Sequence, residues 1–191
     1  MSPAKLERYA FLWSEVRLVL AAGALFLGGM PVIYYLMRML GTWSMSGLVS
    51  SLLQIAQLVS GVAAGYLLYR WHIGGHKLFG GTDQKDKIAF LIMGVSGLNL
   101  GWYALSSTNI GMDIVRDNAA IFLITGAAYL WAGWHLREQW LKNGEQLFAG
   151  SSTAEGASAD AAQNDAPETE EQPEAREAEI VNDAEGGGDG D

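Results

Sequence analysis

The chain has 191 residues, no cysteine and a net charge of −9. The absence of cysteine excludes disulfides, thiolate catalysis and Cys-ligated metal. The charge is unevenly divided, because residues 1–143 carry 11 basic and 7 acidic residues, whereas residues 144–191 carry 1 and 14. This break in composition predicts three parts: a cytoplasmic N-terminal segment at 1–15, a membrane domain at 16–143 and a disordered acidic tail at 144–191.

Four long apolar segments lie in the membrane domain, at residues 16–37, 47–69, 88–106 and 118–136. A helix of about 20 residues crosses the hydrocarbon core of a bilayer, and a helix satisfies its own backbone hydrogen bonds there. The predicted fold is therefore all-α: four transmembrane helices in an up-down bundle, followed by the acidic tail. Pro31 is expected to kink the first helix.

The basic residues predict the direction of threading. Nine lie on one side of the predicted spans and only Arg38 and Arg116 on the other, so both termini and the middle loop are expected in the cytoplasm. No Asp, Glu, Lys or Arg falls in the middle of a predicted span, which argues against a proton relay or an ion-coupled pump. The nine residues are Lys5, Arg8, Arg17, Arg70, Lys77, Lys85, Lys87, Arg137 and Lys142.

Two sets of residues inside the spans are candidates for contacts between helices. The polar set is expected in the bundle interior, either as hydrogen-bonded contacts between helices or as a path for a small solute; it comprises Gln54, Gln57, Ser60 and Asn99. The glycine set has the small-xxx-small spacing that lets helices approach closely, inside the bundle or at a dimer interface; it comprises Gly61, Gly65, Gly97 and Gly101.

The middle loop is basic and carries two histidines. Its cations are expected to contact anionic lipid headgroups, or only to fix the topology; they are Arg70, Lys77, Lys85 and Lys87. His72 and His76 have a zinc-like spacing, and His135 is expected on the same side of the membrane. The neighbouring glycines disfavour a helical face there, and Asp83 is the only suitably placed acid, so no metal site is predicted. No phosphate-binding glycine loop and no nucleophile beside a base is present, so we predict neither a cofactor nor catalytic residues.

A short pattern, Tyr-Leu-x-x-x-Trp-His, occurs twice at a spacing of 63 residues, beginning at Tyr66 and at Tyr129. It is consistent with duplication of a two-helix unit, giving two parallel copies. Convergence is the alternative, because Tyr, Trp and His all favour the membrane interface.

The sequence predicts a non-enzymatic membrane scaffold or accessory subunit, with the acidic tail as a solubilising element or a contact for a basic cytoplasmic partner. The alternative is a small channel or facilitator with a polar path through the bundle or along a dimer axis. Anionic lipids, a second copy or a membrane partner are expected to bind, and nucleic acid is not. The acidic composition is similar to that of halophile proteins, so a cell membrane and a viral envelope of a halophile both fit.

Overall fold

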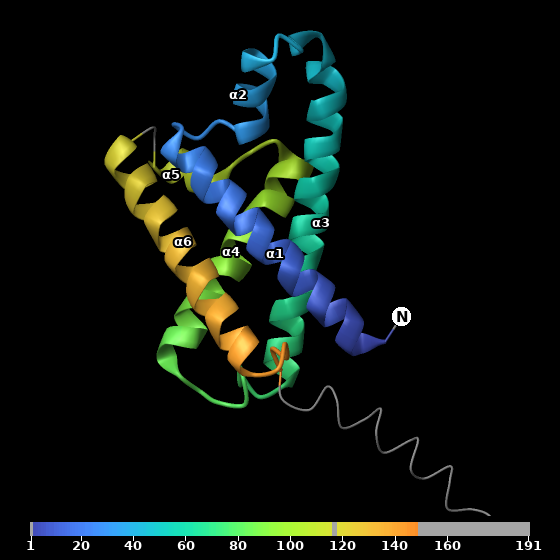
Figure 1. Ribbon diagram of the computed structural model, residues 1–191, viewed down its shortest axis with the longest axis vertical. Helices are drawn as coiled ribbons and strands as arrows, with labels where there is room; N and C mark the ends of the chain where they lie inside the picture. Colours follow the sequence, from blue (N-terminus) through green and yellow to red (C-terminus); the bar gives the residue numbers. More distant parts are fainter. Residues whose placement is uncertain (1, 116–117, 149–191) are drawn as a thin grey trace, which may run out of the picture.

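The computed structural model describes residues 2–115 and 118–148, in which four long helices dominate (Figure 1). Each long helix is of sufficient length and apolar character to cross a membrane. The elements in chain order are α1 (Pro3–Phe26), α2 (Val32–Met39), the 3₁₀ turn η1 (Trp43–Met45), α3 (Ser46–Ile73), α4 (Gln84–Ser106), α5 (Ile110–Val115) and α6 (Ala119–Lys142).

The first membrane helix differs from the predicted span at 16–37. It starts at Pro3, so most of the predicted N-terminal segment is helical, and it ends at Phe26. The chain then breaks, because Gly28 and Gly29 have φ values of +82° and +88°, a region that favours glycine. Pro31 caps the separate helix α2. The expected kink is therefore a full interruption of the helix.

The four long helices form a ring of contacts. α1 packs against α3 and α6, and α4 packs against the same two helices, with a smaller contact between α1 and α4. α3 and α4 approach each other closely, because a Cβ added to Gly61 would lie 2.7 Å from the Cα of Gly101. Only glycine at this crossing allows the two backbones to come so near.

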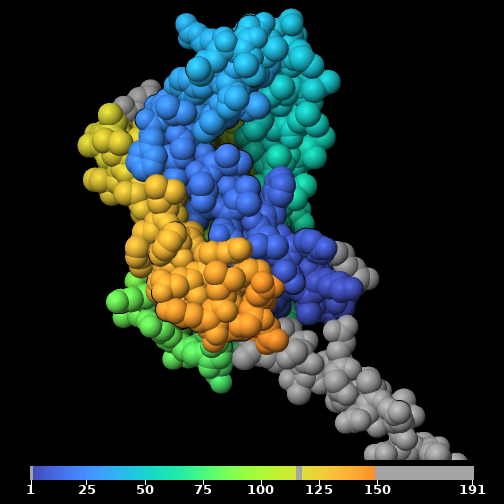
Figure 2. Space-filling model, viewed as in Figure 1, coloured from blue at the N-terminus to red at the C-terminus, as the bar shows by residue number. Residues whose placement is uncertain are grey.

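The main hydrophobic core lies at one end of the molecule, called here the packed end. There the start of α1 meets the end of α3, the start of α4 and the end of α6; α1 and α6 cover one face of it in Figure 2. The core residues are Ala10, Phe11, Leu18, Ala63, Leu67, Leu78, Ala89, Phe90, Met93, Ala132, Leu136, Trp140, Leu147 and Phe148.

The packed end includes residues that the sequence assigned to the tail. Leu147 is only 1% exposed, and its carbonyl accepts a 2.8 Å hydrogen bond from the backbone N–H of Phe79. The folded part of the chain therefore extends beyond the predicted boundary at Asn143, because two apolar residues after that boundary fill the core. The predicted disorder of residues 149–191 lies outside the described residues.

Candidate functional site

A buried carboxylate connects the start of α1 to the packed end. Glu7 is 3% exposed. Its Oε1 accepts a 3.2 Å hydrogen bond from the backbone N–H of Phe148, and its Oε2 lies 3.4 Å from a guanidinium nitrogen of Arg70. Arg70 is thus directed into the protein, whereas the sequence placed it among the headgroup contacts. The pair joins α1 to α3 within the core.

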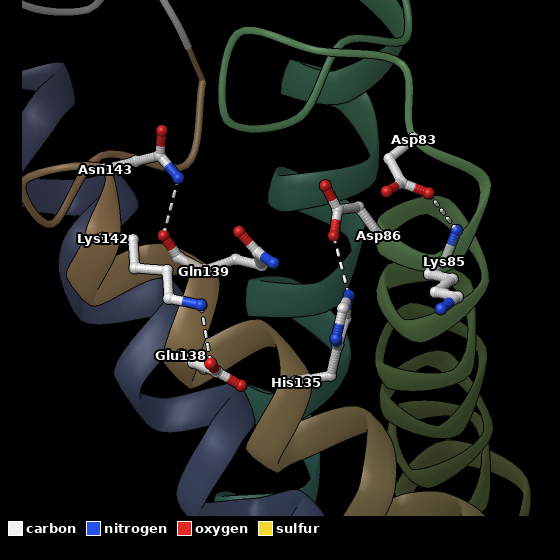
Figure 3. Close-up of polar contacts among 8 residues, drawn as sticks. All are labelled: Asp83, Lys85, Asp86, His135, Glu138, Gln139, Lys142 and Asn143. Atoms are coloured by element: carbon white, nitrogen blue, oxygen red, sulfur yellow. Dashed lines mark hydrogen bonds and ion pairs between the residues drawn. The ribbon is translucent and has the colours of Figure 1, made fainter.

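Two further polar contacts join α6 to its neighbours. His135 Nε2 lies 2.7 Å from Asp86 Oδ1 on α4 (Figure 3). Arg137 lies 3.1 Å from Glu15 on α1. Each pair links α6 to another helix near the packed end, so charges that the sequence places in loops or flanks also fix the geometry of the bundle.

Arg17 lies in the middle of α1 and is 6% exposed. One terminal guanidinium nitrogen donates to Ser96 Oγ at 2.8 Å, and the other donates to the carbonyl of Met93 at 2.7 Å. This contradicts the prediction that no ionisable residue lies in the middle of a span. A buried ionisable residue of the kind found in proton relays and ion-coupled pumps is therefore present in α1.

The position of Arg17 follows from the buried face of α1. The inward residues recur at helical spacing and include two charged residues and a serine. A search for long apolar runs does not find the first half of α1, because it assumes that charged residues such as Glu7 and Arg17 are exposed to solvent. The signal that could have revealed this helix is the helical spacing of its buried positions. These positions are Glu7, Ala10, Phe11, Ser14, Arg17, Leu18 and Ala22.

A cavity of about 730 Å³ extends from Arg17 toward the break between α1 and α2. Its wall is mostly apolar and is built from α1, α2, α3, α4 and α6, with α5 at the far end. Polar groups gather beside Arg17, where Trp13 Nε1 donates a 3.0 Å hydrogen bond to Ser60 Oγ. Ser96 and the phenol-bearing Tyr129 also line this part of the cavity. The cavity wall is therefore mostly apolar, with one group of polar side chains beside Arg17 and another, Asn99 and Asn109, near α5.

Three of the four predicted interior polar residues line this cavity, namely Gln57, Ser60 and Asn99. Asn99 donates to Asn109 Oδ1 at 2.9 Å. Gln54 does not line the cavity and donates instead to the carbonyl of Ala104 at 3.0 Å, which joins α3 to α4. The polar set is thus divided between a contact between helices and the cavity wall.

The glycine set lies along the contact between α3 and α4. Gly61 and Gly101 face each other, and a Cβ on Gly97 would lie 2.6 Å from the Cβ of Ala64. Gly65 is less crowded, because its nearest neighbour would be a methyl group of Leu98 at 3.9 Å.

The remaining loop residues stay near the surface. Lys77 and Lys85 are exposed and Lys87 is half-buried. His72 and His76 lie 3.3 Å apart through their ring nitrogens, while His135 pairs with Asp86. Within residues 2–115 and 118–148, no three His, Cys, Asp or Glu side chains form a group that could hold a metal ion.

The two copies of the Tyr-Leu-x-x-x-Trp-His pattern have different surroundings. Trp71 packs against Phe90, whereas Trp134 is 76% exposed. His72 is exposed, whereas His135 contacts Asp86. The hypothesis of duplication receives no support from similar environments at these positions.

Comparison of the chain with protein-family models, with curated proteins and with solved structures gives no match.

Proposed function

We propose that this chain is a non-enzymatic multi-pass membrane protein that acts as a scaffold or accessory subunit. In this proposal the four long helices form an up-down bundle, with the packed end in the cytoplasm. The observation that carries the proposal is the packed end itself. Its core is filled by large side chains that are almost completely buried, among them Phe11, Phe90 and Trp140. The Glu7–Arg70 ion pair and the Asp86–His135 contact reinforce it.

The charge distribution supports this direction of threading. Arg17 is inside a helix, so it no longer counts among the flanking cations. Eight basic residues remain on the side of the packed end, the described residues place Arg38 at the other end, and an excess of cations favours the cytoplasmic side. Phe148, after which the acidic sequence continues, lies at the same end as the exposed Lys77 and Lys85. A basic cytoplasmic protein is the partner that the charge of the acidic tail fits.

A small channel or facilitator is the second candidate, because Gln57 and Asn99 line a cavity. The packed end argues against a continuous path, since its aromatic side chains would have to separate before a solute could cross. Closed apolar packing favours the scaffold.

The decisive test is solute flux through proteoliposomes containing the full chain. The scaffold proposal predicts that glycerol and urea enter these vesicles no faster than protein-free vesicles of the same lipid. Flux well above that control would favour the facilitator.

Partner capture tests the role of the tail. Full-length protein and a variant ending at Phe148 should be purified in parallel, because that end point leaves the core intact. We expect the cytoplasmic partners to be lost with the tail and the membrane partners to be retained. Identical sets of partners would exclude the tail as the contact element.

A further inference from the structure

Arg17 differs from the other buried charges of this bundle. Three charged residues in the described part of the chain are buried: Glu7, Arg17 and Asp86. Glu7 pairs with Arg70, and Asp86 pairs with His135. Arg17 contacts only neutral acceptors, and within residues 2–115 and 118–148 no carboxylate forms an ion pair with it. Its positive charge is therefore not balanced by a carboxylate of the described chain.

The guanidinium of Arg17 keeps unused donors. An arginine has five N–H groups, and the two hydrogen bonds to Ser96 and Met93 use two of them. The buried Nε has no hydrogen-bond partner within the described structure. A buried, uncompensated cation is energetically costly, and an arginine fork matches the paired oxygens of a carboxylate or phosphate. An anion is thus the group that this site lacks.

The cavity specifies the rest of the ligand. It reaches Arg17 at one end, and its wall beyond that point is mostly hydrocarbon, with leucines from α1, α2, α3 and α4 and a few polar side chains such as Gln57 and Asn99. The volume of about 730 Å³ falls within the range of roughly 300–1,000 Å³ usual for small-molecule sites. A molecule that fits has one anionic end and one apolar body. The leucines are Leu20, Leu25, Leu36, Leu53 and Leu100.

We propose that this cavity binds a single-chain anionic amphiphile, with its carboxylate or phosphate headgroup on Arg17 and its hydrocarbon chain along the leucine wall. The hydroxyls of Ser60 and Ser96 lie beside the headgroup position. This site is a binding function in addition to the scaffold role and does not depend on the tail or on a protein partner.

Equilibrium binding of radiolabelled palmitate to the full chain, in micelles of a neutral detergent, tests the proposal. Unlabelled palmitate, hexadecyl phosphate, hexadecanol and acetate serve as competitors. Because a hydrogen bond to a charged group contributes about 1.5–3 kcal/mol, at least one anionic amphiphile should compete roughly 10- to 100-fold better than the alcohol. Acetate, which lacks the chain, should not compete at matched concentrations. The relative strength of palmitate and hexadecyl phosphate identifies the headgroup.

Three variants locate the site. Arg17→Gln should abolish the preference for the anion, whereas the matched control Arg38→Gln, at an exposed position of α2, should retain it. Ala21→Phe places a ring in the cavity one turn beyond Arg17 and should weaken all of the long-chain competitors by at least tenfold. This third variant leaves Arg17 in place and decides the matter if Arg17→Gln does not fold.

Equal competition by hexadecanol and both anions would overturn the proposal, as would unchanged anion preference in folded Arg17→Gln or unchanged binding in Ala21→Phe. Displacement of palmitate by acetate would also overturn it, because the hydrocarbon chain would then play no part. None of these outcomes alters the flux result that tests the scaffold.

Discussion

The contact between α3 and α4 offers a matched pair of substitutions four residues apart on one helix. In Gly61→Ala, the new Cβ would lie 2.7 Å from the Cα of Gly101, whereas carbon atoms pack best at about 3.5–4.0 Å. The two backbones would have to separate by about 1 Å, and a gap of that size removes roughly a quarter to a half of the dispersion energy of each affected contact. Overpacking of this kind typically costs about 1–3 kcal/mol.

Gly65→Ala is the control, because its new methyl group would meet only a Leu98 methyl group at 3.9 Å, an ordinary contact. Its effect should be neutral, or stabilising by up to about 1 kcal/mol through the better helix propensity of alanine. Reversible unfolding in mixed micelles with increasing sodium dodecyl sulfate, followed by circular dichroism, measures both free energies. Equal stability of the two variants would refute the close approach of α3 and α4.

Two further predictions concern the packed end. Arg70→Met should destabilise the protein by about 2–4 kcal/mol, because it leaves the buried Glu7 charge unpaired. Adding Glu7→Gln should recover part of that loss in the same unfolding assay. A double variant no more stable than Arg70→Met alone would contradict the pairing. A chain ending at Phe148 should unfold like the full-length protein, whereas one ending at Asn143 should lose about 2–5 kcal/mol, because Leu147 and Phe148 leave the core. Similar stabilities of the two truncated chains would contradict the packing of these residues.

Hydropathy alone predicts three of the four long helices well. α3 and α4 contain their predicted apolar spans, and α6 contains all of its span except the N-cap Asn118. Each helix extends its span at the packed end by charged or aromatic residues. The extension is understandable, because the helix continues beyond the apolar run wherever its polar side chains have partners. Asp86 and His135 are such a pair, on α4 and α6.

The first helix shows why the same reasoning fails. A hydropathy criterion ends a predicted span at charged residues such as Glu7 and Arg17, because it has no information about the groups that form hydrogen bonds or ion pairs with them. Glu7 is balanced by Arg70, 63 residues away, and Arg17 is held by Ser96, 79 residues away. Such long-range partners are not visible in a single sequence, so both the start of α1 and the polar end of the cavity could be found only in the folded structure.

The boundary of the tail has a similar explanation. The composition changes at Asn143, but the fold continues to Phe148, because one Leu-Phe pair is enough to fill the space beside Phe79 and Phe90. A change in amino-acid composition averaged over many residues does not reveal that two residues beyond the boundary, Leu147 and Phe148, belong to the folded core.

The measurement that tests the central claim most directly is cysteine accessibility, which the cysteine-free chain permits without background. Single variants Ser44→Cys, in η1, and Thr82→Cys, in the loop before α4, place a thiol at exposed positions at opposite ends of α3. A membrane-impermeant maleimide should label Ser44→Cys in intact cells and Thr82→Cys only after permeabilisation. Labelling of Thr82→Cys in intact cells, with Ser44→Cys protected, would contradict the proposal that the packed end lies in the cytoplasm.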